Sequence, residues 1–307
     1  MKLLLPVAFL LSACASVPTV LPKALPAPIT AKGEVVRHAD VTSLREDILP
    51  RHIDVWLPPS YRNSKKRYPV IYVNDGNTLF DPALSTVSGI DWGVDETMTE
   101  LVAEGRVREA IVVGLHSTTE RYEDYMAEKA IRPLTGDMRR RLAKRPVPFN
   151  IDRMHGDAYV RFLADEVKPA VDRIYRTLPG PEDTFVMGAS TGGLGSAYAA
   201  MERPDVFGAS AGLSTHVGSA EGAFVDWLER NPPDPSRTRL YFDYGDQGID
   251  DDWDYPAYHA RIDAALRKAG YGEGYTNRLY PGTGHGEAFW SERMAEPLLF
   301  LLGAPDG

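Results

Sequence analysis

Two serines stand in the pattern G-x-S-x-G, which places a nucleophile on a tight turn between a strand and a helix. Ser190 lies within residues 188–192 and Ser210 within residues 208–212. The turn is so sharp that its flanking positions must lack bulky side chains, and glycine meets that need. Ser190 follows a strand-like run at 184–187 and precedes a helix-compatible stretch, whereas no helical pattern follows Ser210. We therefore predict that Ser190 is a nucleophile and that Ser210 packs inside a strand.

A serine hydroxyl is a weak nucleophile, so it needs a general base, usually a histidine held by a carboxylate. In one common arrangement of such triads the chain order is serine, acid, histidine. Three histidines follow Ser190. His259 falls inside a helical pattern, where a surface position is expected, and His216 leaves no room for an acid before it. His285 lies in a glycine-rich loop at 281–286, and we predict that it is the base.

The acid that orients the base should follow the strand predicted at 239–243. The next residues, 244–254, hold several aspartates. Their spacing resembles the first ligands of an EF-hand calcium loop, but Tyr255 replaces the turn glycine of that loop and Arg261 its closing glutamate. We expect no metal site here. One of these aspartates should orient His285, and the others should be solvated.

Short apolar runs alternate with helix-like stretches from residue 34 onward. The runs at 68–73, 110–115 and 184–187 are continuous, as in strands that are buried on both faces. Residues 157–176 carry apolar side chains three and four positions apart and predict a long amphipathic helix. The alternation indicates a three-layer α/β fold, in which helices cover both faces of a mostly parallel central sheet.

We predict one domain over residues 33–307, closed by a single helix at 288–302. One connection between its elements is unusually long. Residues 116–156 separate a strand from the next helix, whereas such connections usually have about 2–6 residues. Long connections in compact domains often line a functional site. We expect this one to form a partly helical wall of the site.

The composition is that of an acidic globular protein. The chain has 307 residues with 34 Lys+Arg against 43 Asp+Glu, a formal net charge of −9. Binding to phosphate backbones needs a basic surface, so nucleic acid is not expected as a partner. The single cysteine excludes an internal disulfide and any cage of cysteine ligands around zinc or an iron–sulfur cluster.

The N-terminal residues predict a targeting segment. A short apolar run follows Lys2 and closes on Leu-Ser-Ala-Cys at residues 11–14, which is similar to a bacterial lipoprotein signal. We expect a signal peptide at 1–13, a lipidated Cys14 and a proline-rich tether over 14–32. Ala15 after the cysteine is typical of outer-membrane sorting, so the protein is expected in the bacterial cell envelope, facing the periplasm. The alternative is an ordinary secretory peptide.

A family resemblance is carried by four segments in order along the chain: residues 68–80, 91–95, 121–125 and 284–290, with the Ser190 turn between the last two. Residues 68–80, Tyr-Pro-Val-Ile-Tyr-Val-Asn-Asp-Gly-Asn-Thr-Leu-Phe, resemble a signature of the esterase D-like branch of α/β-hydrolases. That branch includes enterochelin esterases, feruloyl esterases, S-formylglutathione hydrolase and the mycolyltransferases. The resemblance implies an α/β-hydrolase fold that works without a cofactor.

The same resemblance implies roles for several residues. Matched to one family loop, the orienting acid is Asp250; matched to the loop of S-formylglutathione hydrolase, it is Asp251, and we predict Asp250. The backbone N–H groups of Asn77 and Thr191 would form an oxyanion hole. The residues expected to contact substrate are Gly76, Trp92, Arg121, His216 and Trp290.

The function that follows is a cell-envelope serine carboxylesterase, bound to the membrane only through its lipid. The family implies small ester substrates, such as siderophore, hydroxycinnamoyl or carbohydrate acyl esters. An acyltransferase of the mycolyltransferase type is the first alternative. A binding lipoprotein without catalysis, built on the same scaffold, is the second.

Overall fold

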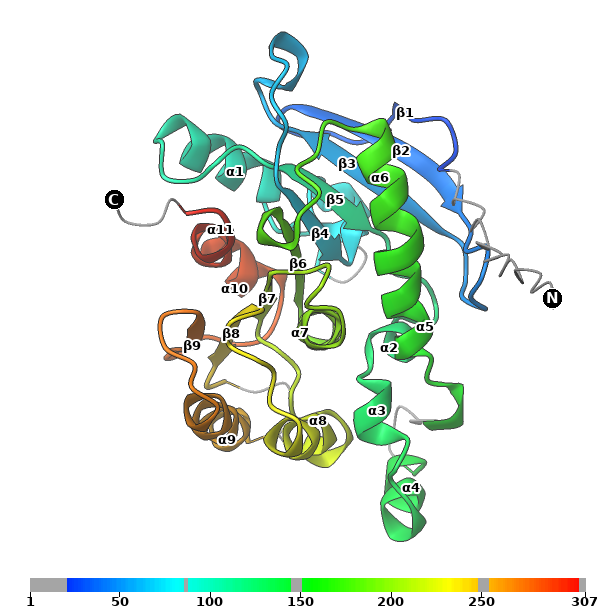
Figure 1. Cartoon of the computed structure of the whole chain (residues 1–307), viewed down its shortest axis with the longest axis vertical. Coiled ribbons are helices and arrows are strands. Elements are labelled where there is room, and N and C mark those ends of the chain that lie inside the picture. Colours follow the sequence, from blue (N-terminus) through cyan, green and yellow to red (C-terminus); the bar gives the residue numbers. More distant parts are fainter. Residues whose placement is uncertain (1–20, 86–87, 145–150, 248–253, 304–307) are drawn as a thin grey trace, which may run out of the picture.

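The computed structural model describes residues 21–85, 88–144, 151–247 and 254–303. Within them the chain forms one nine-stranded sheet in the order β1-β2-β3-β5-β4-β6-β7-β8-β9, with helices on both faces (Figure 1). This is the predicted α/β architecture. The strands are β1 (Leu25–Pro26), β2 (Glu34–Val41), β3 (Arg51–Leu57), β4 (Val70–Asn74), β5 (Ile111–Leu115), β6 (Thr184–Ala189), β7 (Ala209–Leu213), β8 (Arg239–Gly245) and β9 (Tyr275–Tyr280).

The sheet is parallel from β5 to β9 and antiparallel at its other end, where β1, β2 and β3 pair and β3 joins β5. All residues of β4, β5, β6 and β7 are buried, as their continuous apolar runs predict. Ser210 lies inside β7 and is buried there, which confirms its predicted packing role. Because parallel strands end at one edge of a sheet, the loops after β4, β6, β8 and β9 meet.

Helices complete the outer two layers. They are α1 (Val94–Ala103), α2 (Arg121–Tyr125), α3 (Glu128–Ile131), α4 (Gly136–Leu142), α5 (Gly156–Arg161), α6 (Lys168–Ile174), α7 (Thr191–Glu202), α8 (Ser219–Arg230), α9 (Tyr255–Lys268), α10 (Glu287–Glu292) and α11 (Ala295–Leu302). A π-helical segment, Phe162–Val167, joins α5 to α6. Short 3-10 turns also occur, among them η2 (Gly76–Thr78) directly after β4.

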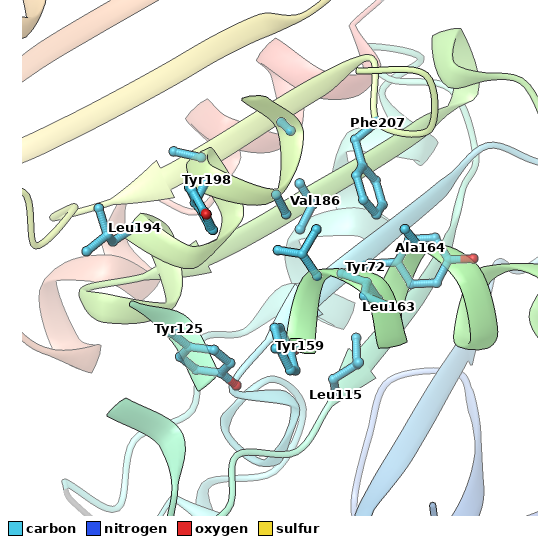
Figure 2. Close-up of a cluster of buried hydrophobic side chains, with 14 of the residues drawn as sticks. Tyr72, Leu115, Tyr125, Tyr159, Leu163, Ala164, Val186, Leu194, Tyr198 and Phe207 are labelled. Carbon is cyan, nitrogen blue, oxygen red and sulfur yellow. The ribbon is translucent and has the colours of Figure 1, made fainter. Parts of the chain in front are cut away.

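The core has one half on each face of the sheet. Along β4, Val70 and Tyr72 enter one half, while Ile71 and Val73 enter the other, because successive side chains of a strand point to opposite faces. Figure 2 shows the half in which Tyr72 lies with residues of α2, α5 and α7, including Tyr125, Tyr159 and Leu194. The opposite half is formed against α1 and α11.

The segment before β2 is attached to the domain. Residues 25 and 26 form β1 and pair with β2, Thr30 N donates to Asp81 Oδ2 at 2.8 Å, and Trp56 Nε1 donates to Lys32 O. The predicted tether over 14–32 is therefore wrong for its second half. The polar edge of β2 and a buried carboxylate supply hydrogen bonds that the proline pattern does not indicate. The described body begins at residue 21.

The long connection 116–156 is partly helical, as predicted: it contains α2, α3 and α4 in its described residues. Both α2 and α3 pack on the helical layer beside α7 and α8 (Figure 1). Among the described residues, no helix has both the length and the apolar composition that crossing a bilayer requires.

Candidate active site

Ser190 occupies the turn between β6 and α7. Its backbone has φ 56° and ψ −126°, a conformation that is rare for a residue with a side chain and costs on the order of 1–3 kcal/mol. The surroundings hold it there: Ser190 N donates to Leu213 O at 2.8 Å, and His216 N donates to Ser190 O at 3.1 Å. The strained turn presents the hydroxyl at the edge where the parallel strands end.

The glycines on either side of Ser190 are required by close packing. A Cβ on Gly188 would lie 2.5 Å from the backbone carbon of Gly192, and a Cβ on Gly192 would lie 2.7 Å from Asp75 Oδ2. Real Cβ contacts are never that short, so both positions exclude a side chain. The pattern around Ser190 thus has the physical reason that the sequence suggested.

His285 reaches Ser190 from the loop between β9 and α10. Its Nε2 lies 2.8 Å from Ser190 Oγ, and its ring meets the Trp290 ring edge-to-face at 5.2 Å. Burial lowers the pKa of His285 to about 3, with further contributions from the positive charges of Arg121 and Arg293. The imidazole is therefore neutral at pH 7 and can accept the serine proton.

Asp250, the predicted orienting acid, and its alternative Asp251 lie outside the described residues. Two neighbouring aspartates are described. Asp246 Oδ1 accepts the Gly282 N–H at 2.7 Å, and Asp254 Oδ1 accepts the Ala257 N–H at the start of α9. Both aspartates are exposed, as expected of the solvated members of this cluster, and each also accepts a backbone N–H.

The other ring nitrogen of His285 faces α9. Tyr255, the first residue of α9, places its hydroxyl 3.5 Å from His285 Nδ1. A small hollow lies beside His285. It is lined by Ser214, Gly245, Gln247, Tyr255 and Gly284, and Gln247 is the last described residue before the segment that holds Asp250. The assignment of the orienting acid to Asp250 stays a prediction.

A buried ion pair near the site, between Asp243 and Arg293, was not predicted from the sequence. Asp243, near the end of β8, accepts from Arg293 Nη2 at 2.9 Å and from Ser214 N at 2.7 Å. Burial raises the pKa of Asp243, and Arg293 opposes that rise. Asp243 thus ties the loop after β7 to the segment after α10. The sequence shows only an aspartate near a strand end, which is not distinctive.

The two predicted oxyanion donors belong to neighbouring turns. Asn77 lies in η2, and its side-chain Oδ1 accepts from Ser117 N at 3.2 Å and Ser117 Oγ at 2.9 Å. Thr191 is the first residue of α7, where backbone N–H groups have no acceptor within the helix. Thr191 Oγ1 lies 3.4 Å from His216 Nδ1. Their role as donors stays a prediction.

The residues expected to contact substrate occupy different places. Gly76 packs against the backbone of Gly114, where a Cβ would collide with it. Trp92 is only 1% exposed and meets the Trp290 ring at 5.6 Å. Arg121 forms a bidentate ion pair with Asp75. Gly76, Trp92 and Arg121 are thus engaged in contacts within the protein.

His216 and Trp290 flank the base. The His216 ring lies 6.2 Å from that of His285, 6.2 Å from Tyr255 and 6.4 Å from Tyr122. His216, Tyr255 and Trp290 thus lie around the His285 ring, and Tyr122 lies beside His216. Among the described residues, no group of three or more histidine, cysteine, aspartate or glutamate side chains is arranged to hold a metal ion.

Comparisons with known proteins identify a family and structural relatives for this chain. A family model described as "Putative esterase" matches residues 49–301. Protein YbbA of Bacillus subtilis (strain 168), itself described as uncharacterized, is 24% identical over 179 residues, which are 58% of each chain. This chain thus matches less than two thirds of that relative's length.

Solved esterase structures share the fold. A ferulic acid esterase superposes with a TM-score of 0.60 at 21% identity, over 89% of this chain and 99% of the other. The enterobactin esterase FES from Shigella flexneri superposes with a TM-score of 0.59 at 17% identity, over 91% of this chain and 60% of the other. Since the family model matches most of the chain, the protein belongs to the esterase family that this model describes.

Proposed function

We propose that the chain is a serine carboxylesterase that splits small esters through an acyl-enzyme on Ser190. The hydrogen bond of 2.8 Å between Ser190 Oγ and His285 Nε2 is the observation that carries the proposal. A neutral histidine at this distance is a base for the hydroxyl proton. The strained turn at Ser190, which leaves its hydroxyl at the strand edge, supports the same role.

The chemistry follows the positions of these groups. Ser190 Oγ attacks the ester carbonyl carbon while His285 Nε2 takes its proton. The N–H groups of Asn77 and Thr191 would hold the negative oxygen of the tetrahedral intermediate, and each such donor is worth about 3–4 kcal/mol in the barrier. The intermediate then collapses, and His285 returns the proton to the leaving alcohol. Water, deprotonated by His285, splits the acyl-enzyme and releases the acid.

We infer that the substrate carries an aromatic group. The proteins named above that share the fold are described as esterases of ferulic acid and of enterobactin. In this chain the rings of Tyr122, His216, Tyr255 and Trp290 surround His285 or one another at 5.2–6.4 Å. Such rings favour an aryl group over a flexible alkyl chain, because edge and face contacts add to apolar burial.

The location is proposed from the sequence alone. A lipid on Cys14 would anchor the protein in the bacterial cell envelope, with its body in the periplasm. Only residues 15–20 separate that cysteine from the described body, and six residues span at most about 20 Å. The body would therefore stay close to the lipid surface.

The test is a turnover screen with the full chain purified in detergent. Hydroxycinnamoyl, catechol-type siderophore and short alkyl esters are compared, and Ser190 is labelled with a fluorophosphonate. Turnover that is faster for the aryl esters is expected. Addition of acceptor sugars detects an acyltransferase, because transfer products then form beside free acid. Labelling and turnover that are both absent would favour a binding protein.

A further inference from the structure

Helix α2, inside the long connection 116–156, contacts the loop after β4 through Arg121. The guanidinium donates from Nε to Asp75 Oδ1 at 2.6 Å and from Nη2 to Asp75 Oδ2 at 2.7 Å. Nη2 also lies 3.5 Å from Ala189 O, next to Ser190. One side chain therefore joins the residue before η2 to the residue before the nucleophile. Bidentate pairs of this kind are strong and fix both partners in orientation.

Asp75 is held from its backbone as well. Its N–H donates to the hydroxyl of Tyr125, the last residue of α2, at 3.3 Å. Asp75 has φ 63°, a left-handed conformation that needs support in a residue with a side chain. Its carboxylate fills the space beside Gly192 in the first turn of α7. Thus α2 forms hydrogen bonds with both the carboxylate and the backbone N–H of Asp75, and the carboxylate lies against the turn that carries Ser190.

The preceding residue ties the same loop to α7. Asn74 Nδ2 donates to Gly192 O at 3.0 Å and to Ser196 Oγ at 3.1 Å. Asn74 Oδ1 accepts from the Tyr159 hydroxyl at 2.6 Å. Figure 2 shows Tyr159 beside Tyr125, and their rings meet at 5.2 Å. Both polar atoms of the Asn74 side chain are thus hydrogen-bonded.

We propose that Arg121 is a positioning residue, which through Asp75 fixes the loop carrying Asn77 relative to the turn carrying Ser190 and Thr191. This inference rests on the proposed esterase function. The two N–H donors come from separate segments, and they can act on one oxygen only if these segments keep their relative place. The structure supplies the link between them in Arg121. The family resemblance instead implied a substrate contact for Arg121.

A substrate-binding role makes a different demand on Arg121. Its side chain is 31% exposed, yet Nε and Nη2 are both taken by Asp75, whose charge neutralises the guanidinium. A substrate carboxylate would have to compete with a buried carboxylate already bound in the best geometry. Loss of a substrate contact would raise KM for anionic esters only. Loss of positioning would lower kcat for every ester, because the oxyanion forms with each of them.

The experiment compares Arg121→Lys, Arg121→Met and Asp75→Asn with the wild type as full chains. A neutral and an anionic aryl ester give kcat and KM, and a boronic acid that adds to Ser190 gives the affinity for a tetrahedral adduct. We expect kcat to fall about 10–100-fold for both esters in all three variants, with KM within about two-fold, because one donor alone contributes 10²–10³. The boronic acid should weaken in parallel. Lysine keeps the positive charge of arginine but cannot donate the two parallel hydrogen bonds that bind one carboxylate.

Arg161→Met is the matched control. Arg161 also forms a bidentate pair, with Glu46, but on the exposed surface of α5, and its loss should leave kcat unchanged. An unchanged kcat in Arg121→Lys and Arg121→Met, or a KM rise confined to the anionic ester in Arg121→Met, would overturn the proposal.

A measurement without turnover separates this inference from the proposed function. Amide hydrogen exchange of residues 74–80 should be faster in Arg121→Met and Asp75→Asn than in the wild type, and unchanged in Arg161→Met. If exchange there does not change, the positioning role fails whatever the activity. If that loop loosens but the wild type turns over no ester, the esterase function fails and the positioning role stands.

Discussion

Ser190 Oγ and His285 Nε2 lie 2.8 Å apart, although 95 positions separate the two residues along the chain. The parallel sheet makes this contact, because the loops after β6 and β9 end at the same edge. The relationship therefore tests both the fold and the proposed chemistry.

Replacement of the two candidate serines should give opposite results. Ser190→Ala removes the nucleophile and should lower kcat by about 10⁶-fold, as in other serine hydrolases. Ser210→Ala changes a residue buried in β7 and should keep esterase activity. Fluorophosphonate labelling followed by mass spectrometry measures both. Labelling lost from a folded Ser210→Ala protein would reverse the assignment.

The aspartates of residues 244–254 should separate by role. Asp250→Asn should cost about 10⁴ in kcat, because the asparagine favours the wrong histidine tautomer. Asp246→Asn keeps an oxygen for the Gly282 N–H and should retain near-normal activity, whereas Asp246→Ala should loosen the histidine loop and lose part of it. Steady-state kinetics of these three variants and of Asp251→Asn decide. A crippled Asp251→Asn with a normal Asp250→Asn would move the acid by one residue.

The fold and the pair Ser190 and His285 could be predicted, because each strand and each of these two residues is marked by a short pattern of neighbouring residues. Continuous apolar runs predict buried strands, and the glycines around Ser190 predict the turn. His259 was expected at the surface because it falls in an amphipathic pattern, but it is buried between Tyr244 and Tyr255. Helical periodicity shows that a helix has an apolar face but not that a polar ring lies within it.

Partners distant in the chain could not be predicted. Arg121 has no local mark that selects Asp75, 46 positions earlier, over a substrate carboxylate. The single closing helix expected at 288–302 is two helices, α10 and α11. The break follows from Arg293, which turns inward to the buried Asp243. Such pairs depend on the tertiary fold and leave no periodic pattern in the sequence.

The pH dependence of activity should report the charges around His285. The base must be neutral, so kcat/KM falls at low pH through the His285 pKa. Arg121 lowers that pKa, so Arg121→Met should move the acid limb to higher pH. A carboxylate at Nδ1 raises the pKa, so Asp250→Asn should move the limb to lower pH. Profiles of residual activity from pH 2 to 8 measure both shifts, and shifts of the same sign would contradict this electrostatic account.

Stability should fall as the pH drops below 6.5, in part because of His259. Burial lowers the pKa of His259 to about 4, so the unfolded chain takes up the proton first, and stability is lost between pH 6.5 and pH 4. The expected loss from this residue between pH 7 and pH 5 is about 2 kcal/mol. Urea unfolding at these two pH values measures it. His259→Gln should be less stable at pH 7 but should lose less on acidification; an equal loss would remove His259 from the account.

Membrane attachment should depend on the thiol of Cys14. Lipidation of a lipoprotein requires that thiol, so Cys14→Ser should give a protein without lipid that leaves the membrane fraction on washing. One acyl chain alone binds membranes only marginally, so stable attachment requires the several chains of a mature lipoprotein. Metabolic labelling with a fatty acid, with and without the substitution, measures the modification.

Pro18→Ala, in the same N-terminal region, is the control and should stay labelled and bound. A wild-type protein that takes up no fatty acid in a bacterial host that processes lipoproteins would leave the ordinary secretory peptide as the explanation. Esterase kinetics in detergent should be equal for Cys14→Ser and the wild type, because Ser190 and His285 lie far along the chain from Cys14, at the edge of the sheet.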